Sequence, residues 1–495
     1  MNKIDAIFKN AVFTYYMTNN KGSNVSEFDK KISFLDWNIY ISNKTNLQYA
    51  ITDYISVVII GYCIDGDGII EPRNLSDYIA KKIKTLDMFI SFSKRLAGKY
   101  IIFLNINGTY YVFTDATASL PVYYTNSKKI QHISSHEYLV AKYAKCNLSK
   151  NSLYMLKGSD QAKTLPNNIT FHENVYLLLP NHYYEIKNNC SIRITKKDIK
   201  NTISPQIAAQ KSLEIINHIK NQIINDFEIK CPLTGGYDSR VVFAVLLGKK
   251  FESYTMTHKM SLTDSDLAVP RQITKKYKIK HFLIEDKIPT AEQFDIANKI
   301  FGKGMYSEYT LQLIATLIKD AGNSCILNGD ILGQIGKSSL HKNIPPIFMG
   351  YRYYACKVHN TSLQALKQSK KWYQEISKEF DKKYICDLFS EEIRLGRWAG
   401  NENCLFSTFG INVLNIFNCQ KIIEIWECVD RKDRKNAQIH KELLKIINSE
   451  LLNYSFNHSE SPLLKIANSN FFLFYIATFT KHYLQALKHF FRSYG

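Results

Sequence analysis

The chain is 495 residues long, and 64 Lys and Arg against 44 Asp and Glu give it a formal charge of +20. This length excludes a small single-domain module, because a domain typically has about 100–200 residues. A composition with 45% hydrophobic and 22% charged residues excludes a disordered or fibrous chain. The lysines are scattered and accompany no recognition motif, so no nucleic-acid partner is expected. Contact of the basic surface with a membrane or an acidic polymer stays open.

Several features favour a cytoplasmic protein. The longest apolar stretch near the C-terminus, Phe471 to Phe479, is shorter than the ~20 residues of a membrane-spanning helix. The first residues, Met1 to Ala6, include Asp5 where a secretory signal would be positively charged and then apolar. Ten cysteines without CxxC pairs or close clusters indicate buried thiols in a reducing compartment rather than disulfides or a zinc site.

Six short runs rich in β-branched and aromatic residues predict strands in the first ~190 residues. They are Ile55 to Ile60, Tyr100 to Asn105, Tyr110 to Thr114, Val122 to Tyr124, Val175 to Leu179 and Tyr183 to Ile186. Asn107-Gly108 lies between two of these runs and is a strong hairpin signal, because both residues tolerate positive φ. The pattern predicts an antiparallel, β-rich N-terminal domain.

A polar and basic segment, residues 188–204, separates this domain from the rest of the chain. Pro205 then opens a segment in which apolar residues between Ile215 and Ile223 recur at helical spacing. We therefore expect two domains, at residues 1–195 and 205–495.

The second domain alternates helical patterns with short apolar runs such as Cys325-Ile326-Leu327. This alternation predicts a parallel α/β core, followed by a mainly helical C-terminal region. No internal repeat or low-complexity tract interrupts it.

Residues 231–240 carry the clearest chemical signal, with the sequence Cys-Pro-Leu-Thr-Gly-Gly-Tyr-Asp-Ser-Arg. Glycines let the backbone approach an anion closely, and the free N–H groups of a first helical turn bind phosphate oxygens. The apolar stretch 241–247 suits a buried helix after this loop. The segment therefore predicts a phosphate-binding loop, although no Lys follows at the GxxxxGK[ST] spacing. A plain turn with Asp238 or Ser239 as the helix cap is the alternative.

The run Thr234-Gly235-Gly236-Tyr237-Asp238-Ser239 resembles the SGGxDS pyrophosphate-binding loop of the asparagine synthetase and β-lactam synthetase family. Residues 98–103, 114–115, 120–124 and 134–135 resemble the glutaminase-like domain of the same family, and 174–186 its final hairpin. The resemblance implies an α+β N-terminal glutaminase-like (Ntn-type) β-sandwich domain. It also implies an α/β synthetase domain of the adenine-nucleotide α-hydrolase-like, pyrophosphate-loop kind, with a helical C-terminal region.

The resemblance further implies ATP and Mg²⁺ as cofactors. Tyr254-Thr255-Met256 resembles the strand that lies beside the adenosine, 264–268 the acidic segment that follows it, and Asn328-Gly329-Asp330 the family's second loop. The residues expected to bind ATP and its pyrophosphate are Leu233, Thr234, Gly235, Gly236, Tyr237, Asp238, Ser239, Met256 and Gly329. Asp238 and Asp330 are the expected metal ligands, since a hard divalent cation prefers oxygen ligands. Asp330 as an ordinary turn residue is the alternative.

Three residues of the C-terminal region are candidates for catalysis. By resemblance, Lys441 would lie over the departing pyrophosphate, although Lys445 shares its helix face at i, i+4 spacing. Asn412 aligns with a catalytic Glu of ammonia-using members. Because an Asn cannot accept the proton of an attacking amine, Glu402 or another acid is the alternative base.

Glutamine-hydrolysing members of the family have a nucleophilic Cys at position 2, where this chain has Asn2. The next cysteine, Cys63, is expected to be a packed thiol. We therefore expect a catalytically inactive glutaminase-like domain and an amine that arrives preformed.

The expected function is ATP-dependent amide formation between a carboxylate and an amine through an acyl-adenylate, in the biosynthesis of a peptide, a small molecule or a surface polysaccharide. A degenerate scaffold or binding protein and a glutamine-dependent amidotransferase are the alternatives. A tRNA-thiolation or sulfate-reduction enzyme is disfavoured, because those enzymes lack a glutaminase-like domain. The two substrates, intramolecular or intermolecular joining and the oligomeric state stay open.

The C-terminal tail combines aromatic residues with Lys481, Lys488 and Arg492. An aromatic and basic helix can lie on an anionic membrane surface, and packing against the domain is the alternative.

Overall fold

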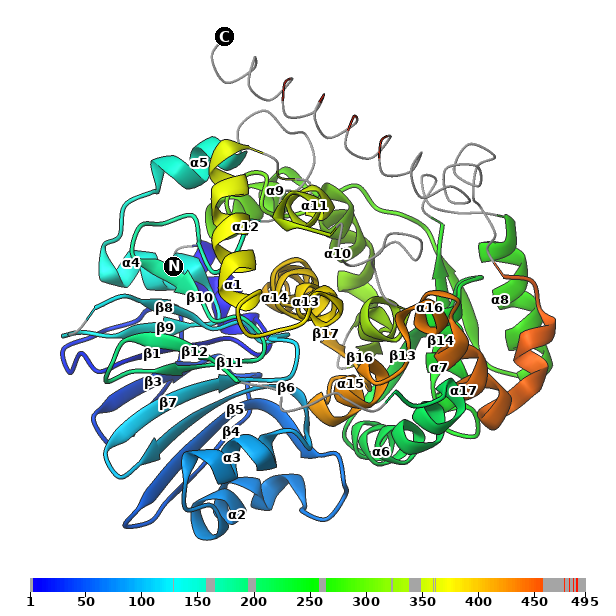
Figure 1. The fold of residues 1–495 in the computed structure, drawn as a ribbon, viewed down its shortest axis with the longest axis horizontal. Helices are drawn as coiled ribbons and strands as arrows, with labels where there is room; N and C mark the ends of the chain where they lie inside the picture. Colours follow the sequence, from blue (N-terminus) through cyan, green and yellow to red (C-terminus); the bar gives the residue numbers. More distant parts are fainter. Residues whose placement is uncertain are drawn as a thin grey trace.

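The computed structural model describes residues 3–127, 129–156, 165–194, 202–257, 264–321, 324–337, 349–358, 360 and 362–456, together with 476, 480, 484 and 487. The N-terminal half contains two antiparallel sheets and the C-terminal half a parallel sheet, and the two halves lie side by side (Figure 1). Within the described residues, no helix combines the length and apolar character needed to cross a membrane.

The two N-terminal sheets are six-stranded. The first has the order β10 (Val175–Leu177), β8 (Tyr123–Thr125), β9 (His132–Ser134), β1 (Tyr15–Thr18), β3 (Trp37–Ile41) and β2 (Lys30–Phe34). The second has the order β12 (Cys190–Arg193), β11 (His182–Glu185), β7 (Thr109–Thr114), β6 (Leu96–Ile106), β5 (Ile55–Asp65) and β4 (Leu47–Ile51). The helices of this half are α1 (Lys3–Asn10), η1 (Pro72–Asn74), α2 (Leu75–Lys82), α3 (Leu86–Ser93), α4 (Glu137–Ala144) and α5 (Lys150–Leu156).

The alternation of side chains along β5 explains how these layers stack. Val58 and Ile60 point into a core shared with the first sheet, whereas Val57 and Ile59 pack in a second core with α2 and α3. Strand residues alternate between the two faces of a sheet, so a strand covered on both faces is apolar throughout. Since α4 packs on β8 and β9 from the other side, the half has a helix–sheet–sheet–helix arrangement.

The six predicted strands are all confirmed as strands, with different ends. The predicted hairpin is confirmed as well, because Asn107 and Gly108 both have positive φ (49° and 81°) and join β6 to β7 as a two-residue turn. The sandwich ends with β12 at Arg193, and α6 begins at Pro205, on either side of the predicted boundary. Ser204 caps α6 by accepting a hydrogen bond from the N–H of Ile207 at 3.2 Å.

The C-terminal half begins with α6 (Pro205–Asp226), β13 (Glu228–Pro232), α7 (Tyr237–Leu246), β14 (Glu252–Met256), α8 (Asp264–Tyr277), β15 (His281–Ile284), α9 (Ala291–Phe301), α10 (Glu308–Ala321) and β16 (Ser324–Leu327). It continues with η2 (Leu332–Gly336), α11 (Tyr351–Lys357), α12 (Leu363–Ile376), α13 (Lys382–Leu388), η4 (Phe389–Ala399) and α14 (Gly400–Thr408). The last elements are β17 (Asn412–Leu414), α15 (Gln420–Glu427), α16 (Arg431–Lys435), α17 (Gln438–Asn448) and η5 (Ser449–Asn453).

The parallel sheet has the order β15-β14-β13-β16-β17 and helices on both faces. Cys325 and Leu327 pack with α6, α7 and α17, whereas Ile326 between them packs with α10 and α14. The chain runs from β13 outward to β15 and then returns to β16 on the other side of β13. The carboxyl ends of β13 and β16 therefore form a topological switch point, where ligands of such sheets bind. The predicted parallel core is confirmed.

Buried polar groups join the two halves. The carboxylate of Asp115, after β7, accepts a hydrogen bond from the Nδ2 of Asn418 at 2.8 Å, and the same nitrogen donates to the carbonyl of Gly98 at 2.6 Å. Lys99, 1% exposed, donates to the Oγ of Ser407 at 2.7 Å, and burial lowers its pKa to about 8. Because unpaired buried polar groups are costly, these bonds hold the halves in one arrangement.

Candidate functional site

The loop between β13 and α7 is closed by its own hydroxyl groups. The N–H of Thr234 donates to the Oγ of Ser239 at 3.1 Å, and the two hydroxyl oxygens lie 3.0 Å apart. The N–H of Gly236 donates to the Oγ1 of Thr234 at 3.2 Å. Gly236 is the N-cap of α7 and carries no side chain to cap it, so the first turn of α7 presents its N–H groups to the carboxyl edge of the sheet.

Neighbouring elements hold this loop at both ends. The Oδ1 of Asp266, on α8, accepts from the N–H of Gly235 at 2.8 Å, and the buried Arg240 donates to the carbonyl of the same glycine at 3.1 Å. Leu233 is tied to β14, because its N–H donates to the carbonyl of Tyr254 at 2.8 Å. The loop geometry is therefore built in before any ligand binds.

The second loop, after β16, approaches the first very closely. A Cβ atom on Gly329 would lie 3.1 Å from the backbone of Asp238, and one on Gly333 would lie 2.8 Å from the Oδ2 of Asp238. A side chain at either position would therefore force a neighbouring atom to shift. Asp330 is oriented by Asn328, whose Nδ2 donates to its Oδ2 at 2.7 Å.

Asp238 receives a third contact, from α17. Its Oδ1 accepts from the Nε2 of the fully buried His440 at 2.6 Å, and its side chain is still 39% exposed. Burial acts to raise the pKa of Asp238, but the hydrogen bond from His440 and the positive charge of Lys337 outweigh it and hold that pKa below its ordinary value. Asp238 is thus ionised and open to a ligand.

The pKa of Asp330 is shifted in the opposite direction from that of Asp238. Burial raises its pKa to about 6, and the nearby charge of Asp238 acts in the same direction. The charge of Asp238 thus acts on Asp330, and two neighbouring carboxylates offer a divalent cation the oxygen ligands that it prefers. Hard oxygen donors of this kind suit Mg²⁺.

A cavity of 530 Å³ opens beside the two loops, and we call it the switch-point cavity. Its sheet side is lined by Leu233, Thr234, Tyr254, Met256, Asn328 and Asp330, and its helix side by Tyr309, Thr310, Trp398, Glu402 and Phe406. The volume is typical of small-molecule sites, which have about 300–1,000 Å³.

Glu402, on α14, is the titratable group of the helix side. Its Oε1 accepts from the Oγ1 of Thr310 at 2.9 Å. Burial raises the pKa of Glu402 to about 7, and the charge of Asp330 adds to the effect. A carboxylate with a pKa near neutrality is suited to proton transfer.

The structure brings most of the predicted site residues together at the switch point. These are Leu233, Thr234, Gly235, Gly236, Tyr237, Asp238, Ser239, Met256, Gly329, Asp330 and Glu402. Asn412 lies at the start of β17, where it pairs with Cys325, away from the carboxyl edge, and it does not line the cavity. Lys441 lies on α17 next to His440, half-buried, and does not line the cavity either.

Sequence reasoning missed three residues of this region. His440 and Lys337 act on Asp238, and Arg240 anchors the loop to the backbone of Leu451 and Ser455. His440 stands beside the predicted Lys441 in the sequence, which is the signal that could have found it. Nothing local indicates Lys337.

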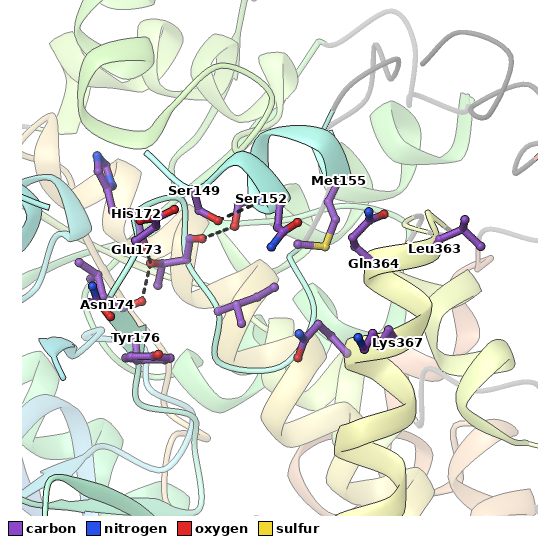
Figure 2. A pocket seen from close by; sticks show the side chains of 15 residues that line it. Ser149, Ser152, Met155, His172, Glu173, Asn174, Tyr176, Leu363, Gln364 and Lys367 are labelled. Carbon is purple, nitrogen blue, oxygen red and sulfur yellow. Dashed lines mark hydrogen bonds between the residues drawn. The ribbon is translucent and has the colours of Figure 1, made fainter. Parts of the chain in front are cut away.

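A larger cavity of 620 Å³ lies between α5, residues 169–176 and α12 (Figure 2). Some of its polar groups already have partners: the Oγ of Ser152 donates to the carbonyl of Thr170 at 2.6 Å, and His172 pairs at 2.7 Å with Glu137, which does not line the cavity. None of the predicted site residues lines it. We therefore place the candidate site at the smaller switch-point cavity.

No protein-family model matches the sequence, and no curated protein matches it. Among solved structures, the chain is similar to an allosteric regulatory enzyme of purine biosynthesis, at 10% identity over 60% of this chain and 74% of that chain, with a TM-score of 0.26. It is also similar to glutamine phosphoribosylpyrophosphate amidotransferase from B. subtilis, complexed with ADP and GMP, at 7% identity over 66% and 70% of the two chains, with a TM-score of 0.23. Similarities this weak carry no argument about function, which rests on the geometry of the site.

Proposed function

We propose that this chain is an ATP-dependent ligase that joins a carboxylate to an amine through an acyl-adenylate, with release of AMP and pyrophosphate. The observation that carries the proposal is the convergence of two glycine-containing loops and two carboxylates, Asp238 and Asp330, at the switch point of the parallel sheet. The resemblance of residues 234–239 to a pyrophosphate-binding loop supports the same interpretation.

ATP would lie along the sheet side of the switch-point cavity. The first-turn N–H groups of α7 and the hydroxyls of Thr234 and Ser239 face the phosphates, and Leu233 and Met256 line the adenosine end. Asp238 and Asp330 would hold Mg²⁺, which supplies positive charge to the phosphate oxygens when bound. The substrate carboxylate attacks the α-phosphorus, and the P–O bond to pyrophosphate breaks.

Positive charge from the protein stabilises the departing pyrophosphate. Lys337 is a candidate for this role, because its Nζ lies 5.9 Å from the ring centre of Tyr237 in the loop and its charge acts on Asp238. Lys441 is the other candidate, from the half-buried face of α17.

Glu402 acts as the general base of the second step. The amine nitrogen attacks the acyl carbon and the C–N bond forms, while the bond to the phosphate oxygen breaks and AMP leaves with the electron pair. The carboxylate of Glu402 takes the N–H proton. Asn412 has neither the chemistry nor the position for this role.

The N-terminal half supplies no glutaminase thiol at Cys63. This side chain is buried in β5, and burial raises its pKa well above the ordinary value, so it is not a thiolate at neutral pH. An amine that arrives as a substrate fits this environment better than ammonia released from glutamine.

The first test is calorimetry with ATP and magnesium. Asp238→Asn removes the charge of a metal ligand while keeping its shape, and we expect binding about ten-fold or more weaker. Asp77→Asn, at an exposed position of α2, is the matched control and should bind as the unmodified protein does. Equal affinity of the Asp238 variant would overturn the assignment and favour a degenerate scaffold.

The second test is formation of AMP and pyrophosphate with a panel of carboxylates and amines, alongside glutamate release from glutamine. AMP formation that requires both a carboxylate and an amine is the expected result. ATP-coupled glutamate release would instead establish a glutamine-dependent amidotransferase.

A further inference from the structure

The switch-point cavity has an acidic lining, although the chain as a whole is strongly basic. Asp266, Asp330 and Glu402 line it, and no Lys or Arg is among the described residues that do so. A concave site lined by one sign of charge focuses its field and concentrates ions of the opposite sign. The lining thus favours binding of a cationic group beside Glu402.

The helix side of the same cavity is aromatic. Tyr309 from α10, Trp398 from η4 and Phe406 from α14 line it around Glu402. Aromatic faces attract ammonium groups and pack well against apolar bodies. The sheet side has a different character, with the glycine loop and Met256, so the two walls suit two different ligands.

We infer that the acceptor substrate is a primary ammonium compound with a compact apolar body, whose ammonium group contacts Glu402 and whose body packs against Tyr309, Trp398 and Phe406. This inference rests on the proposed function, because it assigns the helix side of the cavity to the second substrate of the ligase. It names the acceptor more narrowly, as an apolar amine rather than free ammonia or an amino compound with a second carboxylate.

The surroundings of Glu402 are consistent with this role. The Oγ1 of Thr310 donates to the Oε1 of Glu402 at 2.9 Å, and Trp398 also forms a hydrogen bond to this carboxylate, so two neighbours hold the side chain in place. Arg394 lies over the ring of Trp398, 4.9 Å from its centre, and does not line the cavity. Its positive charge acts to lower the pKa of Glu402. The ammonium therefore meets a carboxylate already held in place, which lowers the entropic cost of binding.

The test is calorimetry without nucleotide at pH 8, with benzylammonium chloride, benzyl alcohol and ammonium chloride as probes. Benzylammonium should bind about ten-fold or more tighter than either of the others, since only it offers both the charge and the apolar body. Equal binding of benzylammonium and benzyl alcohol would overturn the inference, and so would equal binding of benzylammonium and ammonium.

Substitutions at Glu402 and Tyr309 test which side chains contact the ammonium group. Glu402→Gln keeps an acceptor for Thr310 and should remove the preference for benzylammonium over benzyl alcohol, whereas Glu71→Gln, exposed in the N-terminal half, should keep it. Tyr309→Leu keeps apolar area but removes an aromatic face, and should reduce the same preference. An unchanged preference in a folded Glu402→Gln variant would overturn the role of Glu402.

The test of the acceptor can fail without the test of the proposed ligase function failing. A titration of the same protein with ATP and magnesium tests the sheet side alone. Tight ATP binding together with no selectivity for benzylammonium would reject the acceptor assignment and leave the ligase proposal standing.

Discussion

The carboxylate of Asp238 is the point at which three segments of the chain meet. The glycine loop carries it, Gly329 and Gly333 of the second loop pack against it, and His440 of α17 donates to it. Each contact limits its rotation. A metal ligand needs this kind of orientation, because loosely held ligands bind metal less tightly.

Gly333→Ala tests the close approach of the second loop. Its Cβ would lie 2.8 Å from the Oδ2 of Asp238, so either the loop or the carboxylate must move. We expect affinity for ATP and magnesium to fall about ten-fold, measured by calorimetry. Gly350→Ala, whose Cβ would meet nothing within 4 Å, is the control. Equal affinity in the two variants would show that the approach is not needed for binding.

Glu402 gives a pH dependence whose sign follows from its raised pKa. As a base it must be ionised, so the amide-forming step should slow as pH falls through about 7. Asp330 acts to raise that pKa and Arg394 to lower it. The pH–rate profile of AMP formation at saturating substrates is the measurement. A flat profile between pH 6 and 8 would exclude Glu402 as the base.

The same shift predicts a stability change. The pKa of Glu402 is about 7 in the folded protein and near 4.5 in the unfolded chain, so the folded protein holds this proton more tightly. The resulting contribution to stability is fully present at pH values below 4.5 and is lost as the pH rises through about 7. Glu402→Gln should therefore raise stability at pH 8, by at most about 3 kcal/mol, and change it little at pH 4. Melting temperatures at the two pH values check this, and a loss of stability at pH 8 would contradict it.

At the scale of elements, local signals account for the parts of the fold that the sequence predicts well. Asn107-Gly108 specified a hairpin because both φ angles are positive, and Pro205 with Ser204 specified the start of α6. The apolar run 325–327 became β16, at the centre of a switch point. Each of these features depends on a few neighbouring residues.

Other elements depend on tertiary packing and were not located beforehand. The short strands β2 and β4 alternate poorly and lie at sheet edges, and η4 is an 11-residue π-helix between α13 and α14. For the site, Asp238 was predicted from its own loop, but His440 lies 202 residues away along the chain. The sequence does not show which distant residue contacts Asp238, and only the place of His440 beside Lys441 pointed to it.

The contact between β6 and the segment after β17 gives a prediction at this scale. The Nδ2 of Asn418 donates to Gly98, Asp115 and Ser119, and its Oδ1 accepts from Thr117. Asn418→Ala leaves these groups buried without this partner and should cost about 2–3 kcal/mol. Urea denaturation measures the loss, with the exposed Asn453→Ala as the control. A change no larger than the control's would show that the halves are held together elsewhere.

At the scale of the whole molecule, the distribution of charge is uneven. The chain carries +20, yet the lining of the switch-point cavity is acidic. Surface and cavity therefore attract ions of opposite sign: the acidic cavity attracts cations, and the basic surface attracts anions. The two can be tested independently, because salt screens exposed charges more strongly than buried ones.

The C-terminal tail is where the basic surface and an apolar face coincide. The described residues Ile476, Thr480, Leu484 and Leu487 are helical and exposed, at i, i+4, i+8 and i+11. At about 100° per residue these positions lie on one side of a helix. Lys481 and Lys488 are close to these positions in the sequence and lie outside the described residues. We expect Ile476, Leu484 and Leu487 to insert into the surface of an anionic membrane, which would also attract the basic residues of the tail sequence.

The prediction is that the full-length chain sediments with vesicles containing phosphatidylserine and not with phosphatidylcholine vesicles. Replacing Ile476, Leu484 and Leu487 together by Asp removes the apolar face and adds negative charge, so sedimentation should be lost. The control variant carries Asp at three exposed positions of the domains, Tyr54, Ile69 and Ile288, whose exposed fractions are 66%, 74% and 86%. It adds the same negative charge and should sediment as the unmodified protein does. High salt should weaken binding, because it screens the attraction of the lysines. Equal sedimentation of the two triple variants would place the membrane contact, if any occurs, on the basic surface of the domains and not on the tail.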